Sequence, residues 1–268
     1  FSLIAYAVSF KATPLIEEKA PFHGEGLALL ALVLLLTGSI VAGNRPFESM
    51  LPASLSNEDA ERSVISMVRK LLTFVIIPFL VYRRFQFRPT DFGLSPDWRK
   101  AFAPRSIMIF VVMSAVVLGL NYFGGRAAQP VRDGVFTSGQ LLAAIPLLFL
   151  WNYVEVGLVE EFFFRGLLQN RLAVILKSPW GAIFISALIF GLVHAPGMYL
   201  RGAGAVEGLG TEPTLLFCIS YCIAVQSVTG IFFGIIWYKT RNLWLLMGIH
   251  AMTDLLPHLA KFIATWSI

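Results

Sequence analysis

Seven apolar stretches, each close to the length that crosses a lipid bilayer, constrain this chain more than any other feature of its sequence. A helix of about 20 apolar residues crosses a bilayer core and satisfies its own backbone hydrogen bonds there. The stretches run over Leu27–Ala42, Val64–Tyr82, Ser106–Phe123, Leu141–Val159, Trp180–Leu200, Pro213–Tyr238 and Leu243–Ala260. We therefore predict an all-α, polytopic membrane bundle of about seven transmembrane helices, or eight if the apolar residues 1–10 end a further span. The gaps are too short for a soluble domain, so residues 1–268 are expected to form one integral membrane domain.

Composition excludes several functional classes. Hydrophobic residues make up 57% of the chain and charged residues 14%, whereas soluble domains carry about 25% charged residues. So few charges cannot cover a globular surface in water, which argues against a soluble enzyme or a disordered chain. The net charge of +5 does not require nucleic acid, because basic cytoplasmic loops give membrane proteins an excess of Lys and Arg. The expected partner is the lipid bilayer, with no nucleic acid.

The loops between the first three stretches differ in charge, which predicts an orientation. The loop after the second stretch is basic and carries Arg83, Arg84, Arg88, Arg99, Lys100 and Arg105 against Asp91 and Asp97. The loop before it is acidic and carries Glu48, Glu58, Asp59 and Glu61 against Arg45 and Arg62. Since basic loops stay in the cytoplasm, we expect the second loop inside and the first outside. The expected location is the inner (plasma) membrane, in which the chain is multi-pass.

Ionisable residues inside apolar spans are the best pointers to function, because each is costly there unless it is paired or hydrated. The first group is Glu155, Glu160, Glu161 and Arg165. Glu161 and Arg165 are one helical turn apart and can pair, whereas Glu160 has Phe164 at the same offset. Glu160 therefore suits a general base. The alternative is an amphipathic helix end whose charges are simply solvated.

Two further spans carry histidine. His194 precedes Ala195-Pro196 near the end of one span, and His250, Asp254 and His258 follow each other at intervals of four on another. A His and an Asp one turn apart can hydrogen-bond, which fixes the imidazole tautomer. The alternative for both groups is packing, in which polar side chains hold helices together.

The three groups are expected to converge on one pocket. At about 1.5 Å per residue, Glu160 lies about 27 Å before the turn near Ser178, and His194 lies about 24 Å after it. An antiparallel hairpin sets the two at the same level. Gly230-x-x-x-Gly234 predicts close helix packing nearby.

The motifs resemble those of the CPBP family, which comprises type II CAAX prenyl endopeptidases and bacteriocin-processing or Abi proteins. The chain reads Glu160-Glu161-Phe-Phe-Phe-Arg165, then Phe190-Gly-Leu-Val-His194, then His250-Ala-Met-Thr-Asp254. Their order and spacing match the family pattern, and the resemblance covers about half the chain, from about residue 141 to 256. It implies an intramembrane endopeptidase with its catalytic pocket inside the bilayer, which acts on a membrane-associated protein or peptide.

The resemblance also assigns roles. Glu160 would activate a water with help from His194, and His250 and Asp254 would stabilise the oxyanion, with Glu161 and Arg165 supporting. Prenyl endopeptidases carry Asn at the last position, and an ionised Asp254 cannot donate to an oxyanion. Asp254 is therefore either protonated or a partner that orients His250.

Two alternatives stay open from the sequence. We expect no cofactor, but catalytic zinc favours three N or O ligands, and Glu160, Glu161, His194 and His250 would be its ligands if zinc is bound. The alternative function is a non-catalytic membrane scaffold or bacteriocin immunity protein of the same fold. A solute transporter has less support, because the chain lacks an inverted repeat.

Overall fold

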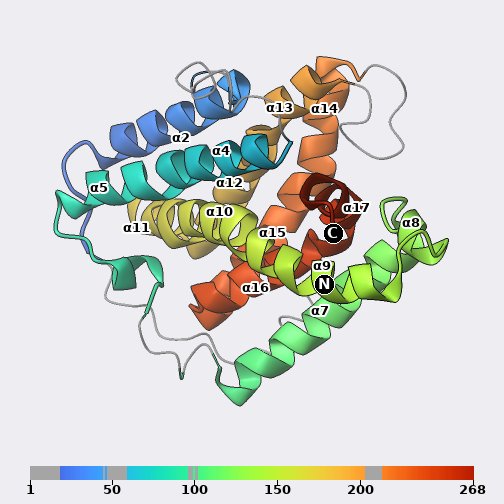
Figure 1. Ribbon diagram of the computed structural model, residues 1–268. Helices are drawn as coiled ribbons and strands as arrows, with labels where there is room; N and C mark the ends of the chain where they lie inside the picture. Colours follow the sequence, from blue (N-terminus) through green and yellow to red (C-terminus); the bar gives the residue numbers. More distant parts are fainter. Residues whose placement is uncertain (1–18, 45, 47–58, 96–98, 100–101, 203–212) are drawn as a thin grey trace.

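A computed structural model describes residues 19–44, 46, 59–95, 99, 102–202 and 213–268. This part of the chain is built from helices joined by turns, without a strand (Figure 1). Six of its helical stretches are long and apolar enough to cross a membrane. The predicted class, an all-α helical membrane bundle, is confirmed. The expected additional span at residues 1–10 lies outside the described residues.

The first three spans agree closely with prediction. The first is α2 (Glu25–Ala42). The second is one continuous helix made of α4 (Asp59–Lys70), η2 (Leu71–Ile76) and α5 (Ile77–Arg83). The third is α7 (Pro104–Gly124). The short helices η3 (Pro89–Phe92) and α8 (Gln129–Arg132) lie in the connections.

The fourth span runs further than its apolar stretch, from Ser138 to Leu176. It consists of α9 (Ser138–Asn152), η4 (Tyr153–Leu158), α10 (Val159–Glu161), η5 (Phe162–Gln169) and α11 (Asn170–Leu176). A capping box of Thr137 and Gln140 starts it, since the two side chains satisfy orphan N–H groups. The apolar stretch ends at Val159, but the helix continues through the charged residues beyond it, as the depth count from Glu160 to Ser178 assumed, because these residues are buried inside the bundle.

The fifth and sixth spans form the next layer. The fifth combines α12 (Pro179–Leu192) and α13 (His194–Arg201), and the sixth combines α14 (Leu215–Tyr221), η6 (Cys222–Gln226) and α15 (Ser227–Thr240). Ser178 caps α12 by accepting a hydrogen bond from the backbone N–H of Gly181 at 3.1 Å. Arg241, with φ 48°, ends α15 in the left-handed conformation.

The predicted seventh span, Leu243–Ala260, is divided into two short helices. They are α16 (Leu243–Thr253) and α17 (Leu255–Trp266). Asn242 caps α16 through the backbone N–H of Leu245 at 3.1 Å. Asp254 departs from helical geometry with ψ 2°, so the single predicted span is wrong and the helix breaks within the His250–Asp254 motif.

Glycines allow the helices that carry the motifs to approach closely. A Cβ on Gly230 of α15 would lie 3.0 Å from the Cα of Ala187 on α12, which confirms the close packing predicted there. A Cβ on Gly157 of η4 would lie 2.6 Å from the carbonyl oxygen of Met247 on α16. The long fourth span therefore packs directly on α16, and Figure 1 shows α10 in the middle of the bundle.

The apolar residues divide between a packed interior and an exposed outer face. Phe163, Phe233 and Trp237 are fully buried, whereas Phe123 is 83% exposed and Leu142 is 81% exposed. Exposed side chains of this kind lie along the long helices, where hydrocarbon rather than water would contact them. The chain is therefore an integral membrane protein.

Candidate active site

Three helices bring the motif residues together in the interior. Glu160 and Glu161 lie on α10, His250 lies on α16, and His194 begins α13. The helix around α10 is irregular, because the π-helical segments η4 and η5 flank it on both sides. Such segments occur frequently at functional sites, where they change the direction in which neighbouring side chains project.

Glu161 is the centre of a buried polar cluster. Its Oε1 accepts hydrogen bonds from Arg165 Nη1 at 3.1 Å and from His250 Nδ1 at 2.6 Å. Glu161 is 0% exposed and Arg165 is 1% exposed. The pairing of Glu161 with Arg165 was expected from their spacing. Helical spacing does not predict the bond from His250 to Glu161, which joins the first motif to the third.

Phenylalanine rings enclose this cluster. The guanidinium of Arg165 lies 4.5 Å from the ring centroid of Phe190 and 5.3 Å from that of Phe233, distances that are typical of cation–π contacts. Phe233 also stacks on the imidazole of His250, with centroids 4.8 Å apart. The charges are thus held in fixed positions away from water.

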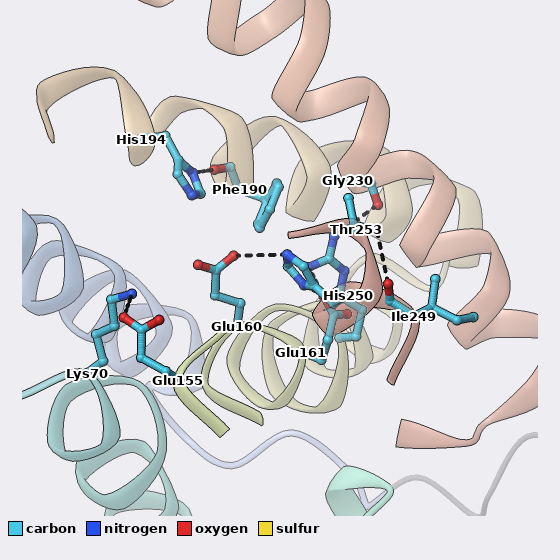
Figure 2. Close-up of polar contacts among 11 residues, drawn as sticks. Lys70, Glu155, Glu160, Glu161, Phe190, His194, Gly230, Ile249, His250 and Thr253 are labelled. Atoms are coloured by element: carbon cyan, nitrogen blue, oxygen red, sulfur yellow. Dashed lines mark hydrogen bonds and ion pairs between the residues drawn. The ribbon is translucent and has the colours of Figure 1, made fainter. Parts of the chain in front are cut away.

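Glu160 is less enclosed than its neighbour. Its Oε2 lies 3.8 Å from His250 Nε2, and its side chain is 13% exposed. Figure 2 shows this carboxylate facing His250, with the ring of His194 turned toward the same space. The separation is too long for a direct hydrogen bond, but one water oxygen could contact both atoms.

His194 is held by its own helix. Its Nδ1 lies 2.6 Å from the carbonyl oxygen of Phe190. A carbonyl can only accept, so Nδ1 carries the proton and Nε2 of the neutral ring keeps a free lone pair. The ring of Phe190 lies between the two imidazoles, with centroids 4.9 Å from His194 and 6.5 Å from His250. The second motif therefore reaches the same cluster as the other two.

Asp254 differs from its expected arrangement. It is half-buried at the break between α16 and α17, and among the described residues its carboxylate has no hydrogen-bond partner. The possible side-chain bond from His250 to Asp254 is not formed, because Glu161 occupies His250 Nδ1. His258, the last member of the expected stripe, is exposed.

Sequence reasoning missed a second ion pair near the site. Lys70 Nζ lies 2.5 Å from Glu155 Oε1, and both side chains are largely buried. Glu155 precedes Glu160 by five residues on the same continuous helix, and Figure 2 draws both side chains. Lys70 lies at the end of α4 inside the second span, so the search for ionisable residues within spans could have found it. Phe190, which lies against Arg165, is the first residue of the second motif, whereas Phe233 carries no such signal among the many apolar residues.

The carboxylates and imidazoles were also considered as metal ligands. In the described part of the chain, no group of three or more His, Cys, Asp or Glu side chains is arranged to hold a metal ion. Glu161, one of the four ligands considered from the sequence, already accepts hydrogen bonds from Arg165 and His250.

Comparison with known proteins agrees with this geometry. Residues 141–256 match the family described as Type II CAAX prenyl endopeptidase Rce1-like. No curated protein and no solved structure matched the chain. The matched segment contains Glu160, His194 and His250, which are the residues that converge inside the bundle. Through this segment the chain is similar to a family of CAAX-type membrane proteases, in agreement with the resemblance seen in the motifs.

Proposed function

We propose that this chain is an intramembrane endopeptidase that hydrolyses a peptide bond of a membrane-associated protein or peptide. The observation that carries the proposal is the difference between the two adjacent glutamates. Glu161 is fully buried and its Oε1 binds both Arg165 and His250, while Glu160 faces His250 Nε2 across 3.8 Å with part of its side chain exposed. One carboxylate thus holds the site together and the other is free to accept a proton.

Glu160 and His194 would activate the water. The Glu160 carboxylate takes a proton from a water whose oxygen then attacks the carbonyl carbon of the peptide bond. The free Nε2 of His194 accepts a hydrogen bond from the O–H group that the water keeps, and this orients the lone pair of the water oxygen. The C–N bond then breaks, and the proton held by Glu160 passes to the leaving amine. This mechanism requires no Ser or Cys nucleophile.

His250 would stabilise the oxyanion of the tetrahedral intermediate. Its Nδ1–H donates to Glu161, which fixes the ring. In the imidazolium form, Nε2 also carries a proton to donate. Asp254 would add a second donor only when its carboxyl group is protonated.

The substrate would reach this site from the lipid. The family match supports a peptide of the CAAX type, and six apolar spans support a substrate delivered by the bilayer. We propose the plasma membrane as the location. A peptide near the membrane surface could extend between helices toward the half-buried His194 and Glu160.

The test is cleavage by the full chain reconstituted in liposomes. The probes are a quenched fluorescent peptide ending in a farnesylated Cys-aliphatic-aliphatic-X sequence and the same peptide without the lipid. We expect Glu160→Gln to lower the cleavage rate by at least about 100-fold, because it removes the base and keeps the shape, and His194→Ala to be as damaging. Glu155→Gln removes the same charge from the same helix, and it should lower the cleavage rate much less. Cleavage by Glu160→Gln at the wild-type rate would overturn the proposal, and a cellular phenotype that survives this substitution would favour the scaffold alternative.

We further propose that the reaction needs no metal. Support comes from Glu161, whose Oε1 is committed to Arg165 and His250. Cleavage should survive exhaustive chelation, and elemental analysis of the pure protein should find well below one zinc per chain. Stoichiometric zinc that is lost together with activity would contradict this.

A further inference from the structure

A second polar site lies at the other end of the first two spans, away from the glutamates. It is a cavity of about 670 Å³. Its lining is strongly polar and consists of Lys19, Arg83, Gln86, Arg88, Thr90 and Asp91. Three of these side chains are cationic and one is anionic, so the cavity carries a net positive charge. Neither the peptidase chemistry nor the helix packing uses it.

Lys19 is fixed in the wall of this cavity. Its Nζ donates to the carbonyl oxygen of Gln86 at 2.6 Å and to Asp91 Oδ2 at 2.8 Å. The same ammonium group lies 4.8 Å from the ring centroid of Phe87. Asp91 also accepts the backbone N–H of Arg88 at 2.7 Å. The single carboxylate of the cavity is therefore already neutralised by its neighbours.

A buried ion pair binds the backbone of Lys19, one of the residues that line the cavity. Arg171 Nε and Nη2 bind the two carboxylate oxygens of Glu25 at 2.5 and 3.0 Å. Nη2 also donates to the carbonyl oxygen of Lys19 at 2.9 Å, and the guanidinium lies 4.9 Å from the ring centroid of Phe87. Because Glu25 and Arg171 are both at least 97% buried, they hold the Lys19 backbone rigidly.

Arg83 and Arg88 provide charge that the protein itself does not use. Both side chains are exposed, and within the described residues neither guanidinium has a hydrogen bond or an ion pair. Thr90 adds a hydroxyl group to the same cavity. Two guanidinium groups and an ammonium group that line one cavity supply several donors to a phosphate, which accepts several hydrogen bonds at once.

The position of the cavity indicates where that phosphate comes from. Arg83 is the last residue of the second span. Ile76 and Leu80, which precede it by seven and three residues along the same helix face, are 43% and 58% exposed. An exposed apolar stripe therefore leads along the helix to the cationic cavity. A lipid has the same order, with apolar acyl chains attached to a polar headgroup.

We propose that this cavity binds the phosphate of an anionic phospholipid headgroup, with the acyl chains lying along Ile76 and Leu80. The phosphate would contact the Arg83 and Arg88 guanidinium groups and Lys19 Nζ, and Thr90 would donate to a headgroup oxygen. The site is separate from the peptidase centre, so this proposal does not depend on the proposed function.

The experiment is native mass spectrometry of the full chain in detergent, titrated with phosphatidylglycerol, phosphatidylcholine or inorganic phosphate. The wild type should retain one phosphatidylglycerol in clear preference to phosphatidylcholine. The double variant Arg83→Gln/Arg88→Gln should weaken this binding by at least about tenfold, because it removes two of the three phosphate-binding cations. The matched control is Arg84→Gln/Arg105→Gln, which loses the same charge from exposed positions outside the cavity and should change binding less than about twofold.

Three outcomes would overturn the proposal. Equal weakening in both double variants would mean that general surface charge holds the lipid. Equal retention of phosphatidylcholine, whose headgroup has no net charge, would mean that the cavity does not select an anionic headgroup. Displacement of phosphatidylglycerol by millimolar inorganic phosphate would assign the cavity to a free anion. A variant whose melting temperature equals that of the wild type has an intact fold. If the double variant melts at a lower temperature, the single variant Thr90→Ala is tested in its place.

Discussion

Two adjacent glutamates hold different positions in the same helix. Successive residues of a helix project in directions about 100° apart, so Glu161 points into the aromatic enclosure of Arg165 while Glu160 points toward His194 and His250. Glu161 is 0% exposed, and the side chain of Glu160 is 13% exposed. The motif therefore places a fully buried, ion-paired carboxylate next to a partly exposed one within a single dipeptide.

This difference predicts opposite effects of two equal substitutions. Glu161→Gln should lower the stability of the folded chain by about 3–5 kcal/mol, because it leaves the Arg165 charge buried without a counter-charge. Glu160→Gln should change stability far less, since the Glu160 carboxylate is partly exposed and lies 3.8 Å from His250 Nε2 without a direct hydrogen bond, yet it should abolish cleavage. Thermal melting in detergent and the cleavage assay, run on both variants, measure the two effects. If the two variants melted at the same temperature, the assigned division of roles would be wrong.

At the level of elements, the site depends on how closely the fourth span approaches α16. A helix with regular side chains throughout could not come this near, because any Cβ at Gly157 would meet the Met247 backbone at 2.6 Å. Gly157 lies in η4, directly before the glutamates, and Met247 lies one turn before His250. The glycine thus sets the distance across which Glu161 reaches His250.

Gly157→Ala should consequently impair both folding and cleavage. Because the added methyl group meets backbone rather than a flexible side chain, the two helices must separate, at a cost of about 1–3 kcal/mol. The matched control is Gly119→Ala in α7, where a Cβ has no neighbour within 4 Å. Melting temperature and cleavage rate should fall for the first variant and stay unchanged for the second. A neutral Gly157→Ala would show that the helices do not pack as described.

The elements also differ in how far the sequence could predict them. The first three spans follow directly from apolar length, and the pairing of Glu161 with Arg165 follows from helical spacing. Hydropathy alone ends the fourth apolar stretch at Val159, and only the helical depth count from Glu160 to Ser178 carried the helix further, to the end now seen at Leu176. The break at Asp254 and the bond from Glu161 to His250 depend on contacts between helices. Such contacts leave no periodic signal in one sequence.

For the whole molecule, charge separates the two ends of the bundle. Lys19, Arg83 and Arg88 gather where α2 begins and the second span ends, and Asp59 and Glu61 lie where the second span begins. One span therefore connects an acidic end to a basic end. Because basic segments are retained in the cytoplasm, this asymmetry predicts which end faces the cell interior.

Cysteine labelling tests this orientation, and the chain is well suited to it. Its natural thiols, Cys218 and Cys222, are 0% exposed, so an impermeant maleimide should leave the unmodified protein unlabelled. Asp59, whose side chain is 74% exposed, and the exposed Arg84 mark the acidic and basic ends of the second span. In intact cells Asp59→Cys should react and Arg84→Cys should not, and inverted membrane vesicles should reverse the two results. Reaction of Arg84→Cys in intact cells would place the basic loop outside, and the anionic lipid of the cavity would then have to come from the outer leaflet.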